Sequence, residues 1–275
     1  MARHPAGKHR YHHHSEFTYP TSLSQRLSSI FLLPLVAVLF FGGILMILSH
    51  TSVIAVNSVD FGSLSSALGA TFLRLLLAYG LSIIFAIPLV LLVNISPRVE
   101  TLLLPLFDII ESVPILAFFP VVILFFIAAG FSEGAAVFII FISMLWNIVF
   151  SLVGGLKTVP TDIKAAARVF GVRGPAYLFK VLLPSVFPYL VTGSLLAWAQ
   201  GWNMIIVAEV LHTYLPGGTE RQDLFGIGSI LVHASTSENT ALFIAAISLI
   251  IVVIALMNFF IWQKLLKYSE RFRFE

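Results

Sequence analysis

Residues 162–184 read DIKAAARVFGVRGPAYLFKVLLP, a basic, alanine-rich stretch that lies between two long apolar segments. The whole chain has 275 residues, of which 59% are hydrophobic and only 11% are charged. Soluble domains carry about 25% charged residues, and a water-soluble fold could not cover this much apolar surface. The composition therefore predicts an integral membrane protein, in which residues 162–184 form a loop between two spans.

Six apolar runs are long enough to cross a bilayer, because a spanning helix needs about 20 mostly apolar residues. These runs are residues 30–48, 67–93, 102–128, 135–153, 182–211 and 241–262. We therefore predict an all-α bundle of six transmembrane helices, with Pro114 and Pro120 as kinks in the third. The predicted parts are a disordered cytoplasmic tail at 1–27, a first span with an external loop at 28–64, a core domain at 65–266 and a second cytoplasmic tail at 267–275.

The positive charges predict the orientation, because cytoplasmic loops of membrane proteins are enriched in lysine and arginine. With both termini inside, all of the 16 lysines and arginines except Arg74 and Arg221 fall in cytoplasmic segments. We therefore expect a multi-pass protein of the cytoplasmic membrane whose loop at 162–184 is cytoplasmic. The polar segment at 212–240 is then external, and it is expected to hold a short re-entrant helix around residues 226–233.

The loop at 162–184 is predicted to form two short helices. Residues 160–162, Pro-Thr-Asp, predict a helix start, and Gly171 is expected to end that helix before Gly174 and Pro175 begin the next. One narrow apolar face is predicted from the helical spacing of Ile163, Ala166, Ala167 and Phe170. Such a helix could dock in a groove of another protein or lie on anionic lipid headgroups. The residues alone leave both possibilities open.

The same stretch resembles the "EAA" loop of ABC importer permeases, the binding-protein-dependent inner-membrane component family. That loop has Glu-Ala-Ala, three residues, Gly, nine residues, Ile, one residue and Leu-Pro. The matching positions here, with alanine in place of the usual glutamate, are Ala165, Ala166, Ala167, Gly171, Val181, Leu183 and Pro184. Further similar segments, among them ESVPILAFFPVVILFF and GIGSILVHA, extend the resemblance over about residues 65–265. They look most like the nitrate, sulfonate and taurine branch.

The resemblance implies the fold and the partners. It implies a type I importer permease whose cytoplasmic coupling helix, between spans four and five, is formed by Ala165, Ala166, Ala167, Arg168, Gly171, Leu183 and Pro184. Two ATPase subunits would dock inside and use ATP and magnesium, a solute-binding protein would deliver solute outside, and a second permease copy or homologous half would complete the pathway. The chain would then be half of the route for a small solute such as nitrate, a sulfonate or taurine.

Several activities are not expected of the chain itself. It contains no GxxxxGK[ST] phosphate loop, so it cannot hydrolyse ATP by that route, and it contains no HExxH motif. We expect a transporter subunit in contact with membrane lipid, without catalytic residues, a bound cofactor, a metal site or a nucleic-acid partner. The alternative is an ion-coupled secondary transporter or channel that needs no ATPase.

Polar residues inside spans predict where a solute passes, because they are costly in lipid and usually face a bundle interior or a cavity. On the fifth span one helical face carries Ser194, Trp198, Trp202 and Glu209, and the second span carries Arg74. We expect these five residues to line the pathway, with Arg74 and Glu209 close together at similar outer depth. The alternatives are tryptophans that serve packing or an interface and an arginine that extends to the membrane surface.

Two other polar groups are not expected to do chemistry. Asp108, Glu111 and Ser112 share a face near the cytoplasmic start of the third span. We expect them to lie at the membrane interface, since their apolar run is longer than a span requires. The histidine-rich segment at residues 4–14 has no fixed metal-ligand spacing, so it is expected to be a flexible tail.

Overall fold

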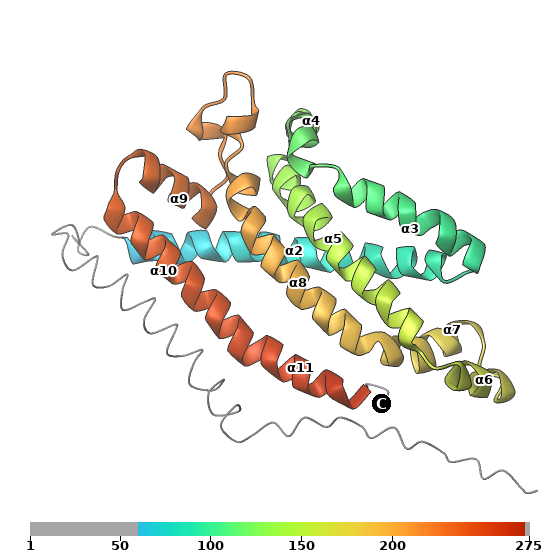
Figure 1. The fold of residues 1–275 in the computed structure, drawn as a ribbon. Helices are drawn as coiled ribbons and strands as arrows, with labels where there is room; N and C mark the ends of the chain where they lie inside the picture. The colour runs from blue at the N-terminus through green and yellow to red at the C-terminus, as the bar shows by residue number, and fades with distance from the viewer. Residues whose placement is uncertain (1–59, 273–275) are drawn as a thin grey trace, which may run out of the picture. The chain divides into compact units, whose positions relative to one another are not determined.

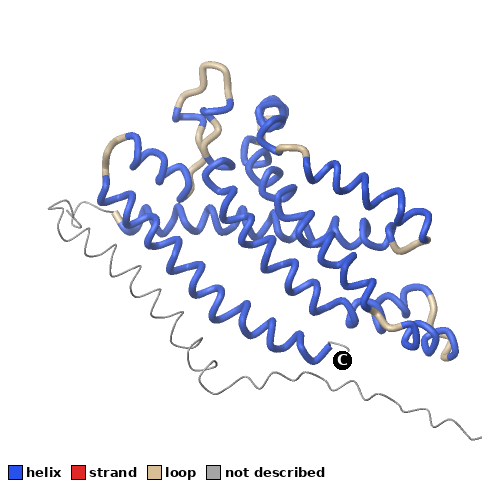
Figure 2. The backbone as a smooth tube through the Cα atoms, viewed as in Figure 1, coloured by secondary structure: helices blue, strands red, loops and turns tan. Residues whose placement is uncertain are grey.

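The structure is a computed structural model that describes residues 60–272, all of which lie within one compact unit of the chain. The predicted tail at 1–27 and the predicted first span at 30–48 lie outside the described residues. Every regular element that the structure describes is a helix, as Figures 1 and 2 show. The predicted all-α class is therefore confirmed for this part of the chain.

Four helical segments are long and apolar enough to cross a membrane, and a bent pair of helices could form a fifth span. The four segments are α2 (Phe61–Val93), α5 (Ser132–Thr158), Leu178–Glu209 with α8 (Leu183–Glu209), and Thr240–Phe272 with α10 (Thr240–Met257) and α11 (Gln263–Ser269). They coincide with the predicted second, fourth, fifth and sixth spans. The described residues therefore support a multi-pass membrane protein, while the count of six stays a prediction.

The predicted third span is broken. Residues 102–128 belong to α3 (Pro97–Ser112) and α4 (Ile115–Ala128), which meet at 80°. Val113 is extended, with φ −70° and ψ 124°, and Pro114 follows it. A residue before proline is disfavoured in the helical region, and proline has no N–H to continue the hydrogen bonds of α3. The expected kink at Pro114 is thus a complete break, and the prediction of one continuous helix over residues 102–128 is wrong. Pro120, the other expected kink, lies inside α4.

The core of the bundle is the pair α5 and α8, which pack along their length, with α2 packed on α5 (Figure 1). Glycines allow this close approach. A Cβ added to Gly155 would lie 2.6 Å from the ring of Tyr189, and one added to Gly193 would lie 2.7 Å from Cβ of Ser151. Lipid tails are as apolar as leucine, so close packing rather than the hydrophobic effect holds helices together in a membrane.

Short helices connect the spans at the two ends of this pair. At one end are α6 (Thr161–Val169), α7 (Gly174–Tyr177) and the π-helical turn Leu178–Leu182, which continues into α8. At the other end are the 3-10 turns His212–Tyr214 and Glu220–Gln222, followed by α9 (Ile227–Thr236). The helix expected around residues 226–233 is confirmed as α9. Since α5 and α8 have 27 residues each, the two ends lie about 40 Å apart.

The packing of α5 on α8 can be tested with neighbouring glycines. We expect Gly155→Ala to destabilise the protein by about 1–3 kcal/mol, because the added methyl group overpacks a closed interface. Gly154 is the matched control: a Cβ there meets no atom within 4 Å, so Gly154→Ala is expected to be neutral or slightly stabilising, as alanine favours helix over glycine. Thermal unfolding in detergent measures both, and equal melting temperatures for the two variants would contradict this packing.

Candidate functional site

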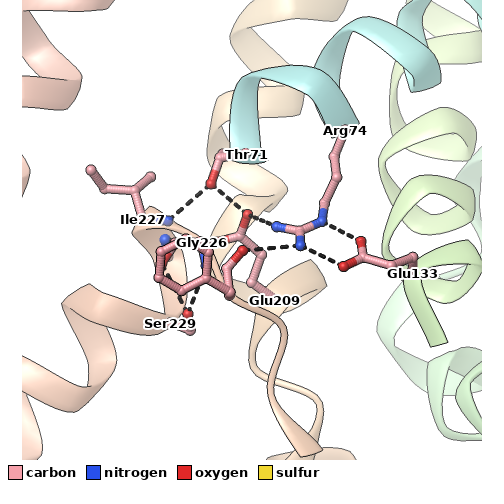
Figure 3. A network of polar contacts seen from close by, with 9 residues as sticks. Thr71, Arg74, Glu133, Glu209, Gly226, Ile227 and Ser229 are labelled. Atoms are coloured by element: carbon pink, nitrogen blue, oxygen red, sulfur yellow. Dashed lines mark hydrogen bonds and ion pairs between the residues drawn. The ribbon is translucent and has the colours of Figure 1, made fainter. Parts of the chain in front are cut away.

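Arg74 is the centre of a buried polar network at the α9 end of the bundle (Figure 3). Its side chain, on α2, is only 6% exposed. It donates to both carboxylate oxygens of Glu133 in the first turn of α5, from Nε to Oε2 at 2.6 Å and from Nη2 to Oε1 at 2.8 Å. It also donates from Nη1 to Oε1 of Glu209 at 2.8 Å and from Nη2 to the carbonyl oxygen of Phe225 at 3.0 Å. One planar guanidinium therefore joins three long helices and the segment before α9.

Glu209, the last residue of α8, is fully buried. Its Oε1 accepts a second hydrogen bond from the hydroxyl of Thr71 at 2.6 Å, and its Oε2 accepts from the backbone N–H of Gly228 at 2.7 Å. The hydroxyl of Thr71 in turn accepts from the backbone N–H of Ile227 at 2.9 Å. A buried carboxylate is tolerable only when its charge is compensated. Arg74 and the partial positive charge at the start of α9 supply that compensation here.

Two glycines are required where α9 meets this carboxylate. A Cβ on Gly226 would overlap the carboxylate of Glu209, and one on Gly228 would lie 2.9 Å from Oε2 of Glu209 and from the carbonyl oxygen of Ile205. The start of α9 is therefore in direct backbone contact with the end of α8. Because only glycine permits this approach, the sequence GIG at 226–228 is part of the network.

The network holds helices together and offers no free catalytic group. Its formal charge is −1, from two carboxylates and one guanidinium, but Glu133 is 47% exposed and keeps contact with solvent. Among the described residues, no buried side-chain nitrogen or oxygen lacks a hydrogen-bond partner. No group of three or more metal-ligating side chains occurs there either. The arrangement can position α9, the first half of α2 and the ends of α5 and α8, and we see no acid–base pair in it.

The structure brings together two of the five predicted pathway residues. The predicted proximity of Arg74 and Glu209 is confirmed by their ion pair, and the alternative that Arg74 extends to the membrane surface is wrong. Thr71, Glu133, Gly226 and Gly228 were missed. Glu133 sits just after a Gly130 turn and looks like a loop residue, and the role of Thr71 depends on α9, which follows it by about 150 residues.

The other three predicted pathway residues lie farther along α8. Ser194 is buried, and its hydroxyl accepts a hydrogen bond from Tyr79 at 2.8 Å. Trp198 is buried against Phe72, Tyr79 and Trp262, with ring centroids 5.6, 5.6 and 6.5 Å away, and Trp202 is half-buried. Trp198 thus has the packing role that was kept as an alternative. That any of these residues line a pathway stays a prediction.

The loop residues occupy the opposite end of α5 and α8. Ala165, Ala166, Ala167 and Arg168 lie on α6, Gly171 ends it, and Leu183 and Pro184 begin α8. Gly171 has φ +68°, and its N–H donates to the carbonyl of Arg168 at 3.1 Å, while that of Val172 donates to the carbonyl of Ala167 at 2.9 Å. This is a Schellman motif, which favours glycine at the left-handed position.

The predicted single apolar face of α6 is divided between the protein and solvent. Ala167 is buried and Ile163 packs against the core, whereas Ala166 is exposed and Phe170 is 81% exposed. Positions 163 and 167 are one helical turn apart, as are 166 and 170, so they form two adjacent stripes rather than one. The inner stripe holds α6 to the chain, and the outer stripe, extended by the 83% exposed Val169, is free for another contact.

On α3, Asp108, Glu111 and Ser112 are exposed, and the hydroxyl of Ser112 donates to the carbonyl of Asp108 at 2.7 Å. Among the ion pairs formed within residues 60–272, none involves either carboxylate. Their predicted place at a membrane interface stays a prediction.

Residues 78–266 match the protein family described as "Binding-protein-dependent transport system inner membrane component". The chain is 32% identical over 193 residues to the nitrate import permease protein NrtB of Leptolyngbya laminosa, covering 70% of this chain and 64% of that protein. It is 30% identical over 148 residues to the bicarbonate transport system permease protein CmpB of Synechococcus elongatus (54% and 52%). It is 25% identical over 191 residues to the taurine transport system permease protein TauC of Escherichia coli (70% and 65%).

The chain thus spans between about half and two thirds of the length of these relatives. A solved structure of the MetNI methionine ABC transporter in an inward-facing conformation contains a chain of similar fold. The TM-score is 0.64 at 16% sequence identity, over 76% of this chain and 97% of that one. The match confirms the kind of helical bundle that the sequence resemblance implied.

The two carboxylates of the network should differ in their effect on stability. We expect Glu209→Ala to lower the free energy of unfolding by about 3–5 kcal/mol, because it leaves Arg74 and the Gly228 N–H buried without this acceptor. Glu133→Ala should cost less than half as much, since that side chain is about half exposed. Glu100→Ala is the control: it breaks a 2.9 Å ion pair with the exposed Lys157 and should cost less than about 1 kcal/mol.

Melting temperatures of the purified variants in detergent give this comparison. If Glu133→Ala and Glu209→Ala lowered the melting temperature equally, the buried end of the network would not be its main support.

Proposed function

Because the chain belongs to the family of binding-protein-dependent transport system inner membrane components, we propose that it is the membrane-embedded permease subunit of an ATP-driven ABC importer. The family match carries the proposal, since it covers residues 78–266 and so includes α6 and most of the long apolar helices. In this proposal both termini and α6 are cytoplasmic, α9 is external, and the chain supplies half of the translocation pathway. A second copy or a homologous half supplies the rest.

The proposed substrate is a small anion. The three relatives are named for nitrate, bicarbonate and taurine, which share an oxyanion group, since taurine carries a sulfonate. The charges of the polar network do not supply an anion site, because its formal charge is −1. A soluble solute-binding protein that selects the anion outside and delivers it to the permease is therefore part of the proposal.

The proposed partner inside is a pair of ATPase subunits, which bind ATP and magnesium. The outer stripe of α6 supports this, because a phenylalanine and a valine more than 80% exposed on a short polar helix gain stability when a groove of another protein covers them. Ala165 stands where the family has a glutamate, so the contact rests on Val169, Phe170 and Ala166 rather than on an ion pair at that position.

The connection of α6 to the bundle suggests how ATPase movement reaches the pathway. α6 is joined to the end of α5 and, through α7 and the π-helical turn, to the start of α8. These two helices pack closely through glycine contacts, so a displacement of α6 moves them together as a rigid unit. Their far ends carry Glu133 and Glu209, and the movement is thereby transmitted to α2 and α9. In this way closure of the ATPase dimer alternates access to the two sides of the membrane.

Co-purification tests the docking role of α6. We expect Phe170→Asp to reduce at least tenfold the amount of ATPase that is recovered with the chain from native membranes in mild detergent, as measured by quantitative mass spectrometry. The reason is that a carboxylate replaces the apolar contact in the proposed groove. Phe61→Asp is the matched control, since Phe61 is also exposed, at 57%, but lies at the start of α2, and it should retain the ATPase.

The outcomes separate the alternatives. An ATPase recovered equally with both variants would keep the importer class but remove α6 as the main docking segment. If no ATPase accompanied the folded wild-type chain, the ion-coupled secondary transporter would become the better proposal, and solute uptake that followed an ion gradient without ATP would support it.

A further inference from the structure

A half-open apolar cavity of about 320 Å³ lies at the α6 end of the bundle. Its walls come from the second half of α2, the last turns of α5, the segment 178–190 and the end of the chain's last helical segment. Among the described residues in this wall, only Tyr268 carries a polar side-chain atom. A cavity of this size and chemistry fits a hydrocarbon chain.

One wall is formed by three aromatic rings that hold the end of the chain against α8. Phe187 on α8 contacts Tyr268 and Phe272, with ring centroids 6.0 and 5.3 Å apart, and Tyr268 contacts Phe272 at 5.6 Å. All three residues line the cavity. The cavity is therefore a packed feature of the fold, since its wall joins segments about 80 residues apart.

A second cavity, which is polar, of about 530 Å³ and largely open to the surface, adjoins the first, because Tyr268 lines both. Its other lining residues are Lys264, Lys267, Glu270 and Arg271. The three cations are spaced i, i+3 and i+7 and so share one face of the terminal helical segment. Within residues 60–272, no carboxylate lies within the 4.0 Å ion-pair distance of their side-chain nitrogens.

The position of these cations is that of a membrane surface. They end the helical segment Thr240–Phe272, which is apolar enough to span the bilayer. Lysine and arginine at such an end lie at the depth of the lipid phosphates. An apolar cavity directly beside three cations at this depth matches the two parts of one molecule, the acyl chain and the phosphate of a phospholipid.

We propose that these two cavities together form a binding site for one anionic phospholipid. An acyl chain fills the apolar cavity beside the ring of Tyr268, and the phosphate is held by Lys264, Lys267 and Arg271. Charge complementarity selects this occupant: the three cations outnumber the single carboxylate of Glu270 in this lining, so a lipid with a net negative charge is favoured over a zwitterionic one. A soluble anion leaves the apolar cavity unfilled. The site differs from general lipid contact because an apolar cavity lined by several segments lies directly beside a cationic cluster.

The bound lipid would contact the part of the chain that follows α6. Leu183 and Pro184, the first residues of α8, line the apolar cavity together with Phe179. Phe179 itself is 65% exposed. An acyl chain at this point covers that surface and braces the first turn of α8 against the end of the chain. Occupancy of the site therefore stabilises the segment through which α6 is joined to the bundle.

Lipid titration of the full chain in detergent tests the site, with melting temperature and the number of lipids retained in native mass spectrometry as readouts. Phosphatidylglycerol should stabilise the wild type more than phosphatidylcholine of the same acyl chains. The triple variant Lys264→Gln, Lys267→Gln, Arg271→Gln should bind phosphatidylglycerol about 100-fold more weakly, from about 1 kcal/mol for each of the three cations near a membrane surface. The matched control removes three cations elsewhere, with Arg98→Gln, Lys164→Gln and Arg173→Gln, and should bind like the wild type.

A second variant tests the apolar cavity and serves if the triple variant does not fold. Ile87→Trp places a larger side chain in the lining and should reduce phosphatidylglycerol binding without removing a charge. Equal stabilisation by phosphatidylglycerol and phosphatidylcholine would overturn the proposal. So would an unchanged affinity for phosphatidylglycerol in either the triple variant or Ile87→Trp. The same holds if glycerol 3-phosphate alone stabilised the chain as much as phosphatidylglycerol, because the cations would then bind a free anion without the acyl chain.

Discussion

The ion pair between Arg74 and Glu209 is the constraint on which one end of the molecule depends. Both side chains are buried, and separating them would leave a charge in an apolar interior, which costs more than the pair itself contributes to stability. The surrounding contacts make the pair specific, because Glu209 also accepts from Thr71 and from the first turn of α9. The first half of α2, the ends of α5 and α8 and the start of α9 must therefore move together or not at all.

The opposite end has no comparable constraint. There α6 follows an extended Val159 and Pro160 and is followed by Gly171 and Gly174, both with positive φ. Only its inner stripe packs on the chain, whereas its outer stripe is exposed. One end of the α5–α8 pair is thus fixed by charge, whereas at the other end α6 is joined through turns that contain Gly171 and Gly174. In the proposed mechanism, this difference lets a partner displace α6 without separating the buried charges, and the glycine-packed helices carry the displacement as a unit.

The parts that could be predicted from the sequence are those that depend on local patterns. Apolar length located four long segments, and the rarity of buried charge singled out Arg74 and Glu209. The parts that were missed depend on contacts between distant segments. Thr71 has its role in the network only because the start of α9 packs against it. The apolar residues of α6 form two stripes only because Ile163 and Ala167 pack against the rest of the chain, whereas Ala166 and Phe170 do not. Pro114 carried the signal for the break in the third span, but hydrophobic length alone could not distinguish a kink from an 80° turn.

In the proposed importer, the network also limits what a transported solute can contact. Its formal charge of −1 repels an anion, and four of the five N–H groups of Arg74 already have acceptors, so nitrate or a sulfonate finds no pair of free donors there unless Glu133 moves. Glu133 is the one charged member with substantial solvent contact, and its removal from Arg74 would expose two donors in a fork suited to an oxyanion. Recognition of an anion here would thus require a change at the start of α5, the helix that α6 also moves in the proposed mechanism. Without such a change, the selection of solute rests with the other parts of the proposed importer.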